Sequence, residues 1–172
     1  MIQLEPFTSA DFGRLISWID NEEELIQFAG PIFNFPLTKR QLNKYLEDKN
    51  RFAFKVVEVN PKQNIGHCEI YLIEETAKLC RILIGEKSFR GKGLGLQIVN
   101  DLLEVSFTKF DKSFAELNVF DWNVNAIKCY GNAGFVINKN IVKTIEVNGK
   151  TWTSLNMTIN KLTWNKIKSN KS

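Results

Sequence analysis

A glycine-rich turn between an apolar stretch and an amphipathic helix constrains the fold of this chain more than any other feature. The turn reads Arg90-Gly91-Lys92-Gly93-Leu94-Gly95, and it follows an apolar run at residues 79–84. Leu94, Ile98 and Leu102 then recur at helical spacing. Small residues let backbone N–H groups approach an anion, and the helix N-terminus and two basic side chains add positive charge. The turn therefore favours a ligand that carries phosphate.

Two common nucleotide-binding motifs do not fit this turn. A Walker loop that starts at Gly85 requires glycine at position 90 and serine or threonine after its lysine, where this chain has Arg90 and Gly93. A dinucleotide-binding pattern that starts at Gly91 requires glycine where Leu96 stands. The remaining alternative to a phosphate site is a glycine-rich turn with two cations at the surface.

Hydrophobic periodicity predicts the order β-α-α-α-β-β-β-α-β-α-β-β along the chain. This order is typical of an α+β fold in a single domain, with a mixed, largely antiparallel central sheet flanked by helices. Thr8-x-x-Asp11 and Thr38-x-x-Gln41 are capping signals for the first and third helices, and Asn148-Gly149 is a hairpin turn. The expected strands lie at residues 2–7, 52–56, 65–73, 79–84, 114–119, 142–147 and 151–159, and the other expected helices lie at 22–28, 94–107 and 126–132.

Composition limits the classes of partner. The 172 residues, 44% of them hydrophobic, suit one domain, which we expect over residues 1–162, followed by a basic, solvated tail over residues 163–172. The net charge of +4 is too small to indicate a nucleic-acid partner. Three cysteines without a C-x-x-C pair and a single histidine predict neither a disulfide framework nor a metal site. Without a secretory signal or an apolar segment near the ~20 residues that span a bilayer, we expect a cytoplasmic protein with no membrane partner.

Two segments resemble one known family. Arg90-x-x-Gly93-x-Gly95 resembles the pyrophosphate-binding signature of the GNAT superfamily of acetyl-CoA-dependent N-acetyltransferases. The segment LNVFDWNVNAIKCYGNAGF, at residues 117–135, resembles the strand–helix–strand signature of that family, with Asn125, Tyr130 and Gly134-Phe135 in their expected places. Residues around Trp18 and in 28–38 further resemble the branch that includes ribosomal-protein N-acetyltransferases and many small-amine acetyltransferases.

The resemblance implies a direct transfer of the acetyl group from acetyl-CoA, as co-substrate, to a small-molecule amine or a protein N-terminus. The residues from Arg90 to Gly95 would hold the pyrophosphate, and the backbone of Ile82, Leu83 and Ile84 would pair with the pantetheine arm. Asn125 would bind that arm, cap a helix, or do both. Tyr130 would protonate the departing thiolate, with a core aromatic residue as the alternative. A non-catalytic acyl-CoA sensor on the same fold is the alternative to the enzyme.

The chain departs from the family pattern at the general base. Asn118 stands where some relatives carry glutamate, and an amide cannot accept the proton. Glu69 is a candidate because His67, Glu69 and Tyr71 share one face of an alternating strand, although a solvated strand face is the alternative. An amine that arrives neutral would need no base. The sequence leaves open whether Glu22, Glu23 and Glu24 attract a cationic amine or only favour the helix dipole, and whether the chain forms a homodimer.

Overall fold

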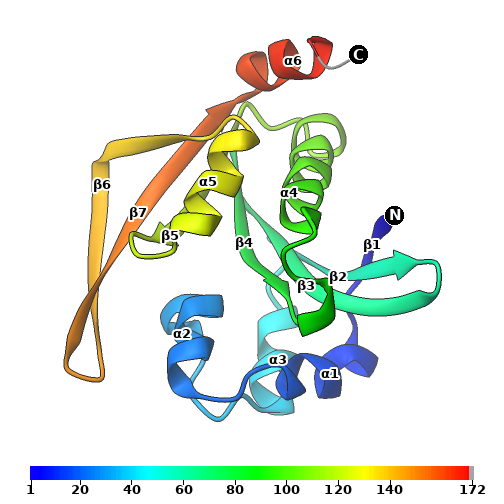
Figure 1. The fold of residues 1–172 in the computed structure, drawn as a ribbon, viewed down its shortest axis with the longest axis vertical. Coiled ribbons are helices and arrows are strands. Elements are labelled where there is room, and N and C mark those ends of the chain that lie inside the picture. Colours follow the sequence, from blue (N-terminus) through cyan, green and yellow to red (C-terminus); the bar gives the residue numbers. More distant parts are fainter. Residues whose placement is uncertain (171–172) are drawn as a thin grey trace. The chain divides into compact units, whose positions relative to one another are not determined.

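The seven strands of the computed structural model, which describes residues 1–170, are β1 (Ile2–Pro6), β2 (Arg51–Val59), β3 (Lys62–Ile73), β4 (Thr76–Ile84), β5 (Phe114–Phe120), β6 (Val136–Val147) and β7 (Lys150–Asn160). Neighbouring strands follow the order β1-β2-β3-β4-β5-β7-β6 (Figure 1). The pair β4–β5 is parallel, whereas the pairs β1–β2, β2–β3, β5–β7 and β6–β7 are antiparallel. The predicted α+β fold with a mixed, largely antiparallel sheet is confirmed.

Six α-helices accompany the strands: α1 (Phe12–Ser17), α2 (Glu22–Ala29), α3 (Lys39–Leu46), α4 (Leu94–Glu104), α5 (Val124–Asn132) and α6 (Lys161–Ser169). The first five reproduce the predicted order of elements. A 3-10 turn precedes α1, another follows α2, and a π-helical turn at Val105–Lys109 extends α4. Across the described part of the chain, no helix combines the length and the apolar character that crossing a membrane requires.

Helix α6 occupies most of the segment that was expected to be a solvated tail. The helix begins after Asn160, whose side chain accepts a hydrogen bond from the Thr163 N–H at 2.8 Å. Trp164 is buried, and its ring lies 5.2 Å from that of Phe107 between centroids. The segment 163–169 is therefore a helix that is anchored by Trp164, whereas its lysines, Lys166 and Lys168, are exposed. Lys171, which we also assigned to the tail, lies outside the described residues.

The chain divides into two compact units. Unit 1 comprises Met1–Tyr71 and Cys80–Ile98, and unit 2 comprises Leu72–Leu79 and Val99–Ser172. Strand β4 therefore begins in unit 2 and ends in unit 1, whereas α4 begins in unit 1 and ends in unit 2.

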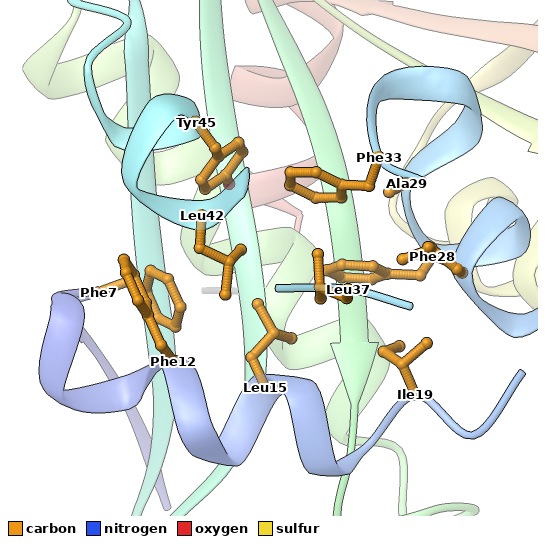
Figure 2. Packing of buried hydrophobic residues seen from close by; sticks show 11 residues of the cluster. Phe7, Phe12, Leu15, Ile19, Phe28, Ala29, Phe33, Leu37, Leu42 and Tyr45 are labelled. Carbon is orange, nitrogen blue, oxygen red and sulfur yellow. The ribbon is translucent and has the colours of Figure 1, made fainter. Parts of the chain in front are cut away.

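Side chains from the three N-terminal helices and their connections form the core of unit 1 (Figure 2). The Phe33 ring packs against the Tyr45 ring, with centroids 5.4 Å apart. The predicted capping signals are present, because the Thr8 N–H donates to Asp11 Oδ2 at 2.9 Å and Thr38 Oγ1 accepts from the Gln41 N–H at 3.3 Å. The cluster comprises Phe7, Phe12, Leu15, Ile19, Leu25, Phe28, Ala29, Phe33, Leu37, Leu42 and Tyr45.

A long hairpin distinguishes unit 2. Strands β6 and β7, drawn in orange in Figure 1, are joined by Asn148 and Gly149, whose φ angles are 50° and 74°. Two consecutive left-handed residues are the geometry that an Asn-Gly hairpin turn requires, so the predicted turn is confirmed. Strand β6 is the outermost strand, and its register with β7 shifts between Asn138 and Val142.

Candidate functional site

The end of β4 leads directly into the glycine-rich turn, and its position is fixed within unit 1. The N–H groups of Gly85 and Glu86 both donate to the carbonyl of Ile65 on β3, at 2.9 and 3.2 Å. A Cβ at Gly85 would lie inside the indole of Trp18, so only glycine fits there. The Trp18 Nε1–H also donates to Glu86 Oε1 at 3.3 Å. The segment that joins β4 to the turn is thus held by β3 and by Trp18, the residue after α1.

The glycines of the turn are required by backbone conformation rather than by crowding. Gly91 and Gly93 have φ angles of 74° and 77°, and a Cβ at either position would meet no atom within 4 Å. The first helical hydrogen bonds run from the N–H groups of Leu96 and Gln97 to the Gly93 carbonyl, at 3.1 and 3.5 Å. The N–H groups at the start of this helix, from Leu94 on, therefore have no helical carbonyl that accepts from them. Such groups suit an anionic ligand.

The two basic side chains of the turn, Arg90 and Lys92, make different contacts. The Arg90 Nε–H donates to the Ile84 carbonyl at 2.8 Å, and its Nη2 donates to the Gly85 carbonyl at 3.4 Å. The Lys92 Nζ lies 5.1 Å from the centroid of the Phe89 ring. Arg90 therefore braces the end of β4, where the sequence had suggested only a charge offered to the ligand. Lys92 remains an exposed cation beside the turn.

The segment that was predicted to meet the pantetheine arm is the last part of β4, and it follows one irregular residue in that strand. Ile82, Leu83 and Ile84 are partly exposed, and Arg81 immediately before them has a φ angle of 51°. This left-handed conformation is uncommon for a residue other than glycine. The predicted strand at residues 79–84 is therefore present within β4, with a left-handed break at Arg81 that the apolar pattern did not predict.

The predicted solvated face around Glu69 is wrong, because this face of β3 is buried. Glu69 is 0% and His67 is 1% exposed. The Glu69 carboxylate accepts two hydrogen bonds from the Arg81 guanidinium, one from the Tyr45 hydroxyl and one from Arg51 Nη1, the last at 2.6 Å. The Tyr45 hydroxyl also lies 3.3 Å from His67 Nε2. The N-terminal segment explains the burial, since the rings of Phe7, which follows β1, and Phe28, on α2, pack edge-on against His67.

Burial and the charges of Glu69 and Arg81 shift the pKa values of three residues in this cluster. Burial, and then the Glu69 charge, raises the pKa of Tyr45 well above its ordinary value, so its hydroxyl stays protonated. Burial opposes the charge on Arg81, but hydrogen bonding and attraction to Glu69 outweigh it and raise the pKa of Arg81. Burial and the Arg81 charge lower the pKa of His67 to about 3, so this histidine is neutral near pH 7.

Three residues of this cluster escaped the sequence analysis as functional candidates: Tyr45, Arg51 and Arg81. One signal was present, because Arg81 is a charged residue inside the apolar run LCRILI. A buried charge requires a partner, so such a position indicates an ion pair. The sequence carries no comparable signal for Arg51, whose Nη2 donates to Asp48 Oδ2 at 3.2 Å.

Unit 2 carries the second group of predicted site residues. Asn123 is the N-cap of α5, because its Oδ1 accepts from the Ala126 N–H at 3.2 Å. The alternative cap role for Asn125 is therefore wrong, and Asn125 is an exposed residue of the first helical turn. Tyr130 lies on the same helix, partly exposed, with its ring 6.4 Å from the Phe135 ring between centroids.

Asn118 lies on β5, in register with Asn156 on β7. The side-chain amides of Asn118 and Asn156 lie within hydrogen-bonding distance, 3.1 Å apart. The position where some relatives carry a base is thus an amide paired with another amide.

Unit 1 brings together residues 82–84, residues 90–95 and Glu69, whereas unit 2 holds Asn118, Asn125 and Tyr130.

Comparison with known proteins identifies a family and similar enzymes. The profile of the family described as acetyltransferase (GNAT) domain matches residues 2–136. Spermidine N(1)-acetyltransferase of Vibrio cholerae serotype O1 is 29% identical to this chain over 142 residues, which cover 80% of each protein. Spermidine N-acetyltransferase from Vibrio cholerae, solved in complex with CoA and spermine, has a TM-score of 0.80 at 23% identity and covers 95% of this chain and 98% of its own. Mutant forms of the spermidine/spermine N-acetyltransferase from the same organism give a TM-score of 0.76 at 22% identity, with 96% and 98% covered.

Proposed function

Because this chain belongs to the GNAT family of acetyltransferases and transfers an acetyl group from acetyl-CoA to a primary amine, we propose that its acceptor is an aliphatic polyamine such as spermidine. The observation that carries this choice is the similarity to a spermidine N(1)-acetyltransferase over most of both chains. We place the reaction in the cytoplasm, where the thiols of Cys68, Cys80 and Cys129 stay reduced.

An acidic first turn supports a cationic acceptor. Helix α2 starts with Glu22, Glu23 and Glu24 after its N-cap, Asn21. Glu24 has a structural role, because its Oε2 accepts from the Asp20 N–H at 2.9 Å. Glu22 and Glu23 are exposed and add negative charge that attracts a polycation.

Acetyl-CoA is held, in this proposal, by the turn and by the strand before it. The N–H groups of the turn between Arg90 and Gly95 bind the pyrophosphate, and the backbone of residues 82–84 pairs with the pantetheine arm. Asn125 hydrogen-bonds the same arm from α5. Since Arg90 is engaged with the carbonyls of Ile84 and Gly85, its contribution includes keeping the end of β4 in place.

The chemistry is a direct transfer. The neutral amine nitrogen attacks the thioester carbonyl carbon, and backbone N–H groups stabilise the oxyanion that forms. The C–S bond then breaks, the thiolate takes the Tyr130 proton, and the amine nitrogen loses its extra proton to water. Glu69 is not assigned as the base, because both of its oxygens already accept hydrogen bonds from arginine side chains and one from Tyr45.

An acceptor screen tests this proposal. The protein is incubated with acetyl-CoA and, separately, with spermidine, spermine, putrescine, an amino sugar and a peptide with a free N-terminus. Free CoA is measured with a thiol reagent, and mass spectrometry identifies the product. We expect kcat/KM for a polyamine to exceed that for the peptide by about 100-fold or more, a difference that corresponds to a few contacts with the second amine. Turnover of the peptide but of no polyamine would refute the acceptor, and acetyl-CoA binding without turnover of any amine would support a sensor.

A further inference from the structure

The left-handed backbone at Arg81 lies in the middle of β4, one residue before the segment that we assign to the cofactor. Its φ angle of 51° is unfavourable for any residue with a Cβ. Such conformations persist only when the surroundings force them, and they occur preferentially at functional sites. The residues around Arg81 must therefore hold its backbone in this left-handed conformation.

Two features of unit 1 hold Arg81 in this conformation. The Arg81 guanidinium donates through Nε and Nη2 to the two oxygens of Glu69, a forked geometry that fixes the position of both side chains. Glu69 is itself held by Arg51 and by Tyr45, which Figure 2 shows projecting from α3. In addition, a Cβ at Gly66 on β3 would collide with the carbonyl of Leu83, so β3 approaches β4 closely just after the break.

The cost of the cluster argues for a positioning role. A buried ion pair contributes little to stability compared with apolar residues of the same volume, and its best-attested use is to select one arrangement of the chain. The arrangement selected here is the break at Arg81 and the direction of the three residues that follow it.

We propose that Glu69 and Arg81 are positioning residues: their ion pair holds the left-handed break in β4 and thereby aims the backbone N–H groups of residues 82–84 at the acetyl thioester. This inference rests on the proposed function, in which those N–H groups meet the cofactor. It assigns Glu69 a role that needs no proton transfer.

A matched pair of substitutions at position 81 separates the effect of backbone conformation from the effect of losing the charge. Arg81→Gly and Arg81→Ala both remove the guanidinium, and in both variants Glu69 keeps Arg51 and Tyr45 as partners. Glycine adopts a positive φ angle without steric cost, whereas alanine does not. The Gly variant therefore retains the break more often than the Ala variant. We expect kcat with acetyl-CoA and spermidine to be about 10-fold higher in Arg81→Gly than in Arg81→Ala, the ratio that corresponds to typical strain at such a position.

A control pair is available at Glu74, which has a φ angle of 45° in the turn after β3. Glu74→Gly and Glu74→Ala should differ in thermal stability but share one kcat, because this turn is not part of the proposed site. Equal kcat values for the two Arg81 variants, or wild-type kcat in Arg81→Ala, would overturn the positioning role.

A measurement without turnover separates this inference from the proposed function. Amide NMR signals of residues 82–84 are followed while CoA is added to the wild type and to both Arg81 variants. We expect these signals to shift in the wild type and in Arg81→Gly, and to shift much less in Arg81→Ala. If CoA binds the wild type without moving these signals, the proposed cofactor path fails. If the signals shift equally in all three proteins, only the positioning role fails.

Discussion

His67 makes the free energy of unfolding of this protein depend on pH, and the sign and size of this dependence follow from its pKa. It is the single histidine of the chain and is 1% exposed, between the rings of Phe7 and Phe28. Burial and the Arg81 charge lower its pKa from 6.5 to about 3. Acidification therefore protonates His67 in the unfolded chain well before it does so in the folded protein.

The magnitude follows from the two pKa values. The folded value is depressed, so the contribution is fully present above the unfolded value of 6.5 and is lost as the pH falls toward 3. Each pH unit well below the unfolded value costs about 1.4 kcal/mol, so lowering the pH from 8 to 5 should remove about 2 kcal/mol from the free energy of unfolding. This is a large fraction of the roughly 5–15 kcal/mol that stabilises a typical domain.

Urea unfolding, followed by tryptophan fluorescence at pH 8, 7, 6 and 5, measures this loss. The matched control is His67→Gln, which keeps a polar side chain beside the Tyr45 hydroxyl but does not titrate. We expect the wild type to lose about 2 kcal/mol more than the control between pH 8 and 5, whatever the starting stability of the control. Parallel pH profiles for the two proteins would refute the assignment of a buried, neutral His67.

Three further substitutions test separate parts of the structure. Gly93→Val places a β-branched residue at a φ angle of 77°, so acetyl-CoA affinity measured by calorimetry should fall about 10-fold or more, and unchanged affinity would contradict the role of the turn. Tyr130→Phe should lower kcat by about 100-fold with nearly unchanged acetyl-CoA affinity, and full activity would eliminate the proton-donor role. Trp164→Ala should lower the free energy of unfolding in urea by about 3 kcal/mol or more, and a loss below about 1 kcal/mol would show that α6 does not pack as described.

Local sequence signals were sufficient where the structure depends on local chemistry. Thr8 and Asp11 form the expected capping box, and Asn148-Gly149 forms the expected hairpin turn. Gly91 and Gly93, in the glycine-rich turn, adopt positive φ angles that glycine reaches at no steric cost. In each case a few neighbouring residues determine the backbone without help from the rest of the chain.

Predictions from sequence were wrong where the environment of a residue depends on tertiary packing. Alternation along β3 identified the face that carries His67 and Glu69, but a period of two does not say what covers a face. Tyr45 on α3, Phe28 on α2 and Phe7, which follows β1, cover it, and these long-range contacts leave no signal in the strand itself. Helix α6 and its buried Trp164 were not predicted, although Asn160 was a usable N-cap signal.

The outer edge of β6 has a consequence for solubility. Its exposed apolar residues include Val136 and Val142, which are 66% and 53% exposed, and a long apolar edge invites another strand to extend the sheet. Here the register shift between Asn138 and Val142 interrupts the edge, and Lys139 and Lys143 place charge on either side of Val142. An incoming strand would meet a bulge and two lysines instead of a continuous ladder. The hairpin can therefore be long and apolar without becoming a template for aggregation.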